Sequence, residues 1–444
     1  MTKLLDYWTQ RPGWLKFDPV TNNWLIIFSG TAMRIGLNFL AGIIITRSLG
    51  PADFGIYSVL LAAASLIGVA VDFGLTEAAV KTIAVAWTAS RLEAVRQSRL
   101  FFWLKLGLAG LGVALSLLLA PLIVPYLLQL PGYGWLFALT LVGVVTTTLS
   151  GSVNAILQAI GKFSQISMVL IISSGCSLML AVGLALLGQL NLVTTLLVVS
   201  AGTSLIGFII GYRALPADWP SIVSFAKQPR LETGWREPAQ ALFRFGGWLW
   251  LANIGKVLLA YLDMFLVNLW LDPITVGVYA LALGLSRRTE IVNHSLYTVL
   301  LPMASALKSG RAIGAYLYQG LIRSALVSLL LLLLIPVSEW FIPFIYGGEF
   351  APAVRLFQLM LGLAIFDILT LPPLLLIYTF ERSHIAALAE GLRVVIMVVA
   401  SLWLVSSLGV YGVIVAKLIA KVVGVVVTLG LLLRHYLQLR KTNR

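Results

Sequence analysis

The chain alternates between long apolar segments and short polar ones. Because a helix needs about 20 apolar residues to cross a bilayer, the pattern predicts an all-α polytopic membrane protein with about twelve transmembrane helices. The predicted spans are residues 24–46, 54–75, 101–125, 134–158, 164–188, 192–212, 245–270, 276–300, 325–343, 353–378, 384–406 and 410–433. The fourth and eighth are the least regular, because Thr146–Ser152 and Arg287–Ser295 interrupt their apolar runs.

Polar segments divide the predicted spans into two sets of six. We expect a cytoplasmic N-terminal segment at residues 1–23, one six-helix bundle at 24–213 and a second at 244–436. Residues 214–243 are polar and carry four prolines, which predicts a cytoplasmic linker rather than a folded domain. Residues 437–444 form a basic cytoplasmic tail.

Basic residues are unevenly distributed along the chain. The net charge is +14, although only 11% of the residues are charged, against about 25% in soluble domains. Most of the Lys and Arg residues fall in segments that are cytoplasmic if the N-terminus lies inside, as the positive-inside rule requires. The charge therefore indicates topology, with both termini cytoplasmic, rather than binding to nucleic acid.

A short motif occurs twice, half a chain apart, at Leu49–Tyr57 and Leu271–Tyr279. Four residue types coincide in the two copies: Leu49 and Leu271, Pro51 and Pro273, Gly55 and Gly277, and Tyr57 and Tyr279. Proline suits the first turn of a helix, glycine lets helices approach closely, and tyrosine suits the outer membrane interface. With six spans in each repeat, the halves share one orientation, which predicts two parallel six-helix repeats around a central cavity.

Two cations occupy equivalent positions in the repeats. Arg34 and Lys256 each lie near the middle of a predicted span, half a chain apart and in the register of the repeated motif. A cation there costs at least ~2.5 kcal/mol. One interpretation is a structural ion pair with a buried carboxylate. The interpretation that we favour is a positively charged cavity between the halves that binds an anion.

The eighth predicted span contains two further cations, Arg287 and Arg288. A guanidinium group suits phosphate because its donors form a planar fork, so these residues are candidates for the same anion cavity. The alternative is that a helix ends at this point. Arg287 and Glu290 are three residues apart and could pair on one helix.

Acidic residues within or near the spans have two candidate roles. Asp263, which lies two turns after Lys256, and Glu290 and Asp72 could each bind a coupling ion, either H⁺ or Na⁺, or balance the charge of a cation. Charge balance is the interpretation that we prefer. Lys417 and Lys421 lie one turn apart on the last span and are expected to face water or lipid phosphate.

No catalytic motif is evident in the sequence. It lacks a P-loop, a Gly-x-Ser-x-Gly motif and a His-Glu-x-x-His motif. His294 has no second His or Cys nearby, so no metal site is predicted. We therefore expect a protein that is not an enzyme and that uses no cofactor besides a coupling ion.

Three segments resemble the polysaccharide transporter family: Thr46–Leu60, Val71–Ala79 and Tyr346–Ala353. That family includes the O-antigen flippases. It belongs to the superfamily of multidrug, oligosaccharidyl-lipid and polysaccharide exporters, which also holds the lipid II flippases. The resemblance covers most of the chain, and its first segment is the most specific.

The resemblance implies two six-helix bundles around a cavity that opens alternately to each side. It also implies a substrate with a polyprenyl tail, a pyrophosphate and an oligosaccharide, and cavity cations that engage the pyrophosphate. We therefore predict a flippase that moves a polyprenyl-pyrophosphate-linked oligosaccharide from the inner to the outer face of the membrane for O-antigen or exopolysaccharide export. Its expected partners are the lipid bilayer, a polysaccharide polymerase and glycosyltransferases.

Two alternatives stay open. A cation-coupled exporter of drugs or small solutes would need an acidic cavity, whereas the balance of charge in the predicted spans is basic. A scaffold for polysaccharide assembly would tolerate changes to the cations within the spans and depend instead on residues 214–243.

Overall fold

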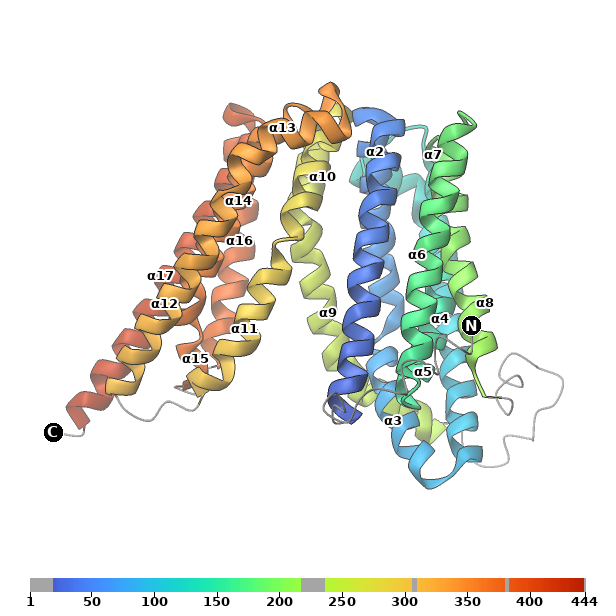
Figure 1. Ribbon diagram of the computed structural model, residues 1–444, viewed down its shortest axis with the longest axis horizontal. Coiled ribbons are helices and arrows are strands. Elements are labelled where there is room, and N and C mark those ends of the chain that lie inside the picture. Colours follow the sequence, from blue (N-terminus) through green and yellow to red (C-terminus); the bar gives the residue numbers. More distant parts are fainter. Residues whose placement is uncertain (1–18, 217–235, 306–309, 380–382, 443–444) are drawn as a thin grey trace, which may run out of the picture. The chain divides into compact units, whose positions relative to one another are not determined.

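The computed structural model describes residues 19–216, 236–305, 310–379 and 383–442. In these ranges the chain is built of helices joined by short turns and contains no strand (Figure 1). The predicted all-α fold is confirmed. Most of the predicted segments 1–23 and 214–243 lies outside the described residues, whereas α17 (Val410–Thr442) continues into the predicted tail.

The chain divides into two compact units. Unit 1 comprises Met1–Ile45, Ala63–Ile123 and Gly132–Val257, and unit 2 comprises Thr46–Ala62, Val124–Pro131 and Leu258–Arg444. These bounds differ from the predicted linear halves, because two short segments of the first half pack with the second. The first of them carries the N-terminal copy of the repeated motif, which contacts the C-terminal copy directly.

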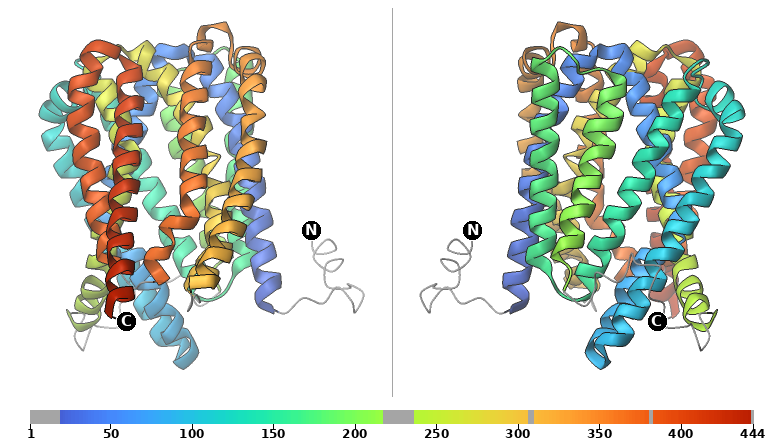
Figure 2. Two further views of the ribbon diagram at one scale, coloured as in Figure 1. Left: turned by 90° about the vertical axis from the view of Figure 1, so that its left-hand side faces the viewer. Right: turned by 90° about the vertical axis from the view of Figure 1, so that its right-hand side faces the viewer.

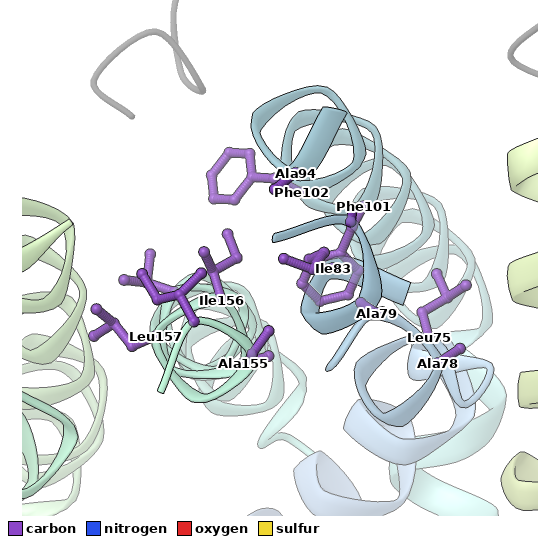
Figure 3. Packing of buried hydrophobic residues seen from close by; sticks show 14 of the residues in the cluster. Leu75, Ala78, Ala79, Ile83, Ala94, Phe101, Phe102, Ala155, Ile156 and Leu157 are labelled. Atoms are coloured by element: carbon purple, nitrogen blue, oxygen red, sulfur yellow. The ribbon is translucent and has the colours of Figure 1, made fainter. Parts of the chain in front are cut away.

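Unit 1 is built from the helices of the first half and the beginning of α9. They are α2 (Pro19–Asp72, shared with unit 2), α3 (Leu75–Ala89), α4 (Arg91–Leu122), α5 (Gly134–Ala159), α6 (Phe163–Leu186), α7 (Leu192–Thr194), η3 (Thr195–Gly202), α8 (Thr203–Ala214) and α9 (Arg236–Trp270, shared with unit 2). The side chains of Leu75, Ile83, Phe101 and Ile156 are fully buried where α3, α4 and α5 pack together (Figure 3). This packing positions the polar residues on the neighbouring turns.

Unit 2 contains the remaining helices. They are η2 (Ile123–Leu127, nearly all in this unit), α10 (Pro273–Arg287), α11 (Glu290–Ser305), α12 (Gly310–Leu332), α13 (Leu334–Tyr346), η6 (Gly348–Phe350), α14 (Ala353–Leu374), α15 (Leu376–Thr379), α16 (Ser383–Leu408) and α17. Within the unit, α16 and α17 pack side by side along most of their length (Figure 2).

The first two predicted spans form one long helical stretch with a kink. Leu25–Asp72 contains 48 residues, which at 1.5 Å per residue is about 72 Å, more than twice the ~30 Å hydrocarbon thickness. Gly50 breaks the helical geometry with φ 69° and ψ 174°. Pro51 follows it as the first residue of the second helix, which confirms the predicted role of this proline.

Nine helical segments of the described chain are long and apolar enough to cross a membrane. They cover most of every predicted span except 245–270 and 276–300. The first of these is covered by the single helix α9, and the second is divided between α10 and α11. The chain is thus a multi-pass membrane protein.

The eighth predicted span is interrupted, as its sequence suggested. Helix α10 ends at Arg287 and α11 begins at Glu290, so the continuous span at 276–300 was a wrong prediction and the helix-end alternative is correct. The cause is local: the amide groups of Arg288 and Thr289 bond to the carbonyl groups of Leu285 and Ser286, which tightens the end of the helix.

Candidate functional site

Arg34 lines a polar cleft within unit 1, formed by α2, α5, α6 and α8. The cleft has a volume of about 300 Å³. Besides Arg34, its walls carry two amides, Asn38 and Asn154, and seven Ser and Thr residues. The Arg34 side chain is exposed, and no carboxylate of the described residues lies within ion-pair distance of it. The arrangement places one cation among many uncharged hydrogen-bonding groups.

Helical periodicity builds the polar wall of this cleft. On α5 the lining residues are Thr147, Ser150, Gly151 and Asn154, and on α6 they include Leu170, Ser173, Ser174 and Ser177. Both sets have the spacing i, i+3, i+4 and i+7, which places all four positions on one helix face. The two polar stripes therefore face a common space rather than lipid.

Several of the hydroxyl groups donate to their own helix. Thr147 donates to the carbonyl of Gly143 at 2.7 Å, Ser173 to that of Leu170 at 3.2 Å, and Ser204 to that of Ser200 at 3.0 Å. A hydroxyl group whose proton is used in such a bond can still accept hydrogen bonds through the lone pairs of its oxygen. The cleft therefore presents acceptor oxygens on α5, α6 and α8, next to the donors of Arg34.

Lys256 lines a different cleft of unit 1, of about 340 Å³, between the end of α2, the start of α3 and α9. Asp72, Glu77, Asn253 and Trp250 also line it. The Lys256 side chain is exposed and makes no ion pair with the described carboxylates. Arg34 and Lys256 thus belong to one unit and line separate clefts.

The Lys256 cleft is held in place by contacts between α9 and the junction of α2 and α3. The Trp250 indole N–H donates to the carbonyl of Ala70 at 3.0 Å, and its ring stacks on Phe73 at 4.7 Å. The Asn253 amide donates to Glu77 at 3.1 Å. At the junction, Phe73 and Gly74 adopt positive φ angles of 48° and 67°, which ends α2 and lets α3 begin in a new direction.

Asp72 is bound to a buried lysine that the sequence analysis did not select. The Lys105 ammonium lies 2.8 Å from the Asp72 carboxylate and also donates to the Thr76 hydroxyl. Thr76 in turn donates to Asp72 at 2.6 Å. The Lys105 side chain is only 8% exposed. Because Lys105 neutralises Asp72, the geometry favours charge balance over ion coupling for this carboxylate.

Asp263 is the centre of a buried network in unit 2. Its carboxylate accepts hydrogen bonds from the Lys417 ammonium at 2.6 Å, the Tyr279 hydroxyl at 2.9 Å and the Met264 amide at 2.9 Å. Asp263 is completely buried. It therefore neutralises a cation, as preferred from the sequence, and that cation is Lys417 of α17.

A second ion pair lies one turn further along α17. Lys421 binds Asp367 of α14. The expectation that Lys417 and Lys421 face water or lipid phosphate was wrong, because each reaches an aspartate on a neighbouring helix. The pairs tie α17 to α9 and to α14.

Arg287 and Arg288 lie at the break between α10 and α11. Arg287 donates to the carbonyl of Ala260, and its guanidinium group lies 4.4 Å from the centre of the Tyr261 ring. It makes no ion pair with Glu290, because the two residues are on different helices. Arg288 and Glu290 have exposed side chains. The anion-binding role of these arginines stays a prediction.

The glycines of the repeated motif meet inside unit 2. A methyl group on Gly55 would overlap the carbonyl oxygen of Pro273, and one on Gly277 would overlap that of Pro51. The predicted close approach of helices at Gly55 and Gly277 is confirmed, and the two copies contact each other. Pro273 is the first residue of α10, as predicted.

The two tyrosines of the motif are buried. Tyr57 is 9% exposed, and Tyr279 is fully buried and bonded to Asp263. The prediction that both rings lie near the outer interface stays a prediction, since burial within the protein does not fix their depth in the membrane. A charged partner within the unit accounts for the burial of the Tyr279 hydroxyl.

Sequence reasoning missed the polar cleft residues and the lysine partners. The signal for the first was present, because the positions i, i+3, i+4 and i+7 on each of the fourth and fifth spans lie on one face, and six of these eight residues are Ser, Thr or Asn. The partners of Lys105, Lys417 and Lys421 are far away in the sequence, so no local pattern reveals them. In the described residues, no group of three His, Cys, Asp or Glu side chains could hold a metal ion.

Comparison with solved structures identifies the fold. An inward-facing multidrug resistance MATE family transporter of the MOP superfamily has a TM-score of 0.67 at 15% identity, over 95% of this chain and 99% of that chain. Lipid II flippase MurJ in an inward closed conformation has a TM-score of 0.59 at 14% identity, over 90% of this chain and 87% of that chain. At these identities the likeness concerns the fold alone.

Comparison of sequences identifies the family. No curated protein matches the chain. Residues 44–355 match the family described as polysaccharide biosynthesis protein, which covers well over half of the sequence and includes both copies of the repeated motif. The resemblance to polysaccharide transporters inferred from Thr46–Leu60 and the other two segments is thereby confirmed. The chain belongs to the polysaccharide biosynthesis protein family.

Proposed function

We propose that this protein is a flippase that moves a polyprenyl-pyrophosphate-linked oligosaccharide from the inner to the outer face of the bacterial cytoplasmic membrane. Membership of the polysaccharide biosynthesis family supports the class of substrate. The observation that carries the proposal is Arg34, an intramembrane cation that lines a cleft of hydroxyl and amide groups and has no carboxylate partner among the described residues.

The physical reason is the cost of dehydrating the head group. A pyrophosphate and its sugars lose their water on entering hydrocarbon, and unpaired buried charges are very unfavourable. A guanidinium group replaces water on the phosphate oxygens with charge-assisted hydrogen bonds, while the polyprenyl tail stays in lipid. Lys256 lines a separate cleft of unit 1 and is a candidate for a second cation that meets the head group. The role of Arg287 and Arg288 in binding an anion is likewise a candidate.

The proposal includes alternating access with cytoplasmic termini. Downhill entry of H⁺ or Na⁺ is the expected source of energy. Of the three carboxylates considered for coupling, Asp72 and Asp263 are each bound by a lysine, which leaves Glu290 as the candidate with an exposed side chain. The proposed partners are glycosyltransferases, which make the substrate, and a polymerase, which consumes the product.

The test is the pool of lipid-linked glycan in cells that carry variants of this protein. In Arg34→Ala cells we expect a complete polyprenyl-linked oligosaccharide to accumulate on the inner face of the membrane, with normal amounts of the protein. Ser164→Ala, at an exposed position outside the clefts, should leave the pool unchanged. Normal export in Arg34→Ala, Lys256→Ala and the double variant would contradict the cation model.

A drug or small-solute exporter is the second candidate, because Glu77 and Trp250 beside the second cleft would suit an organic cation. Its prediction is different: loss of the protein would increase sensitivity to cationic drugs and leave the glycolipid pool unchanged. Lys256 in the same cleft would repel such a drug, so we rank this function lower.

A further inference from the structure

The polar cleft of unit 1 contains far more uncharged hydrogen-bonding groups than an anion needs. One guanidinium group satisfies a phosphate oxygen pair, yet the cleft also has two amides and seven hydroxyl-bearing residues on α5, α6 and α8 as well as α2. Polar side chains within membrane spans are costly and usually serve a ligand or a partner helix. The chemistry of these groups indicates what the ligand presents to them.

Hydroxyl groups in membrane helices usually serve structure by bonding to their own backbone or to a neighbouring helix. Thr147, Ser173 and Ser204 do bond to their own helices, but those bonds use only their protons. Their oxygens keep free lone pairs at the wall of a cleft. Such a wall needs a ligand that donates several hydrogen bonds.

Asn154 points to the same requirement independently. Its side-chain oxygen is buried and has no hydrogen-bond partner in the protein, and the residue lines the cleft. A buried acceptor without a partner costs about 1–3 kcal/mol. A ligand that donates to it recovers that cost on binding.

We infer that this cleft is a saccharide subsite, which holds the sugar ring attached to the pyrophosphate while Arg34 binds the pyrophosphate itself. A sugar ring carries several hydroxyl donors and acceptors, which match hydroxyl oxygens and amide groups. The inference rests on the proposed function, because it needs a glycolipid as the substrate.

The size of the cleft limits what it can hold. Ligand sites commonly enclose about 300–1,000 Å³, and this one, at about 300 Å³, lies at the lower end. It has room for the phosphate-linked end of the head group and not for a whole oligosaccharide. The subsite therefore selects the first sugar, and distal sugars can vary without loss of binding here.

The experiment measures the binding of two lipids to the full-length protein in nanodiscs. The first is the polyprenyl-pyrophosphate oligosaccharide of the source cells, and the second is the same polyprenyl pyrophosphate without sugar. The quantity compared between variants is the ratio of the two dissociation constants. It separates recognition of the sugar from recognition of the phosphate.

We expect the unsubstituted protein to bind the glycosylated lipid at least about tenfold more tightly, since two or three hydrogen bonds have that effect. Asn154→Ala and the double variant Ser173→Ala with Ser177→Ala should lose most of that ratio and keep the affinity for the bare lipid. Arg34→Ala should weaken both lipids and preserve the ratio. Ser164→Ala, on the same α6 helix but outside the cleft, is the matched control.

Three results would overturn the inference. If the cleft variants keep the ratio, the sugar is recognised elsewhere. If the unsubstituted protein binds both lipids equally, the cleft does not recognise a sugar, and the proposed function still stands. If it binds neither lipid, the proposed function fails as well. Unchanged melting temperatures for the variants would exclude loss of folding as the cause.

Discussion

In unit 1, Arg34 and Lys256 line clefts without an ionic partner in the described chain, whereas in unit 2 Lys417 and Lys421 are each bound to an aspartate of a neighbouring helix. All four side chains lie in apolar segments and look alike in the sequence. Their surroundings differ, and the surroundings decide the role. A cation paired with a carboxylate stabilises the packing of helices, and an unpaired cation at a cleft is available to a ligand.

Lys105 shows that cations paired with a carboxylate are not confined to unit 2. It belongs to unit 1, is more deeply buried than Lys417, and is bound to Asp72. Its ammonium group is surrounded by a carboxylate, a hydroxyl and the ring of Phe101 at 5.6 Å. Each unit therefore contains structural cations. A carboxylate partner distinguishes them from the cations that are candidates for binding the substrate.

The largest effect on stability is expected from Lys417→Met. The change leaves the Asp263 carboxylate buried and without its cation, which typically costs about 3–5 kcal/mol. The melting temperature in detergent should fall sharply, and little protein should reach the membrane. Adding Asp263→Leu should restore most of the stability, because it removes the uncompensated charge. Failure of the double variant to recover would show that the network has a role besides charge balance.

The matched change Lys256→Met tests a cation that has no carboxylate partner in the described chain. It also removes one lysine, but from an exposed position in a cleft. We expect a shift in unfolding free energy within about 0.5 kcal/mol, as for substitutions outside buried networks, together with a loss of glycolipid export. Melting temperature and the inner-face glycan pool are the two measurements. A drop in stability as large as that of Lys417→Met would erase the distinction.

A loss of stability smaller than that of Lys417→Met is expected from Gly55→Ala and Gly277→Ala. The added methyl group would overlap a proline carbonyl of the other motif copy, and such overpacking costs about 1–3 kcal/mol. Thermal unfolding of the two variants should show similar losses, because the contacts are reciprocal. Gly107→Ala is a suitable control, since a methyl group there meets nothing within 4 Å. Equal stability of all three variants would mean that the helices separate at no cost.

A loss of stability smaller than that of the glycine variants is expected at Asp272, the N-cap of α10. Its carboxylate accepts bonds from the Thr275 amide at 3.1 Å and hydroxyl at 2.6 Å. Partial burial raises the pKa of Asp272, but these hydrogen bonds outweigh it and lower the pKa below its ordinary value. Asp272→Ala should cost about 1 kcal/mol at neutral pH.

The dependence of this effect on pH follows from the lowered pKa. A group whose pKa is lower in the folded protein contributes stability above its unfolded pKa, and loses it as the pH falls through the folded pKa. The difference in melting temperature between the unsubstituted protein and Asp272→Ala should therefore shrink on acidification from about pH 7 to about pH 3. A difference that grows in acid would contradict this assignment.

Much of the fold could be predicted from apolar runs and one repeated motif. Pro51 and Gly55 are local signals. A proline favours the first turn of a helix and a glycine permits close packing, whatever the rest of the fold. The fate of Lys417 could not be predicted in this way. Its partner Asp263 is far away in the sequence, and only the packing of α17 against α9 brings them together. The stripe on α6 was a local signal that hydrophobic run length alone does not reveal.

The reciprocal contact of the two motif copies has a consequence for how such a chain could arise. The contact is reciprocal: Gly55 faces the carbonyl of Pro273, and Gly277 faces the carbonyl of Pro51. That exchange is the mark of an isologous interface, the kind that joins identical subunits around a two-fold axis. The same surface would hold together a homodimer of six-helix chains. A single gene encoding both copies then needs no new interface, only a linker.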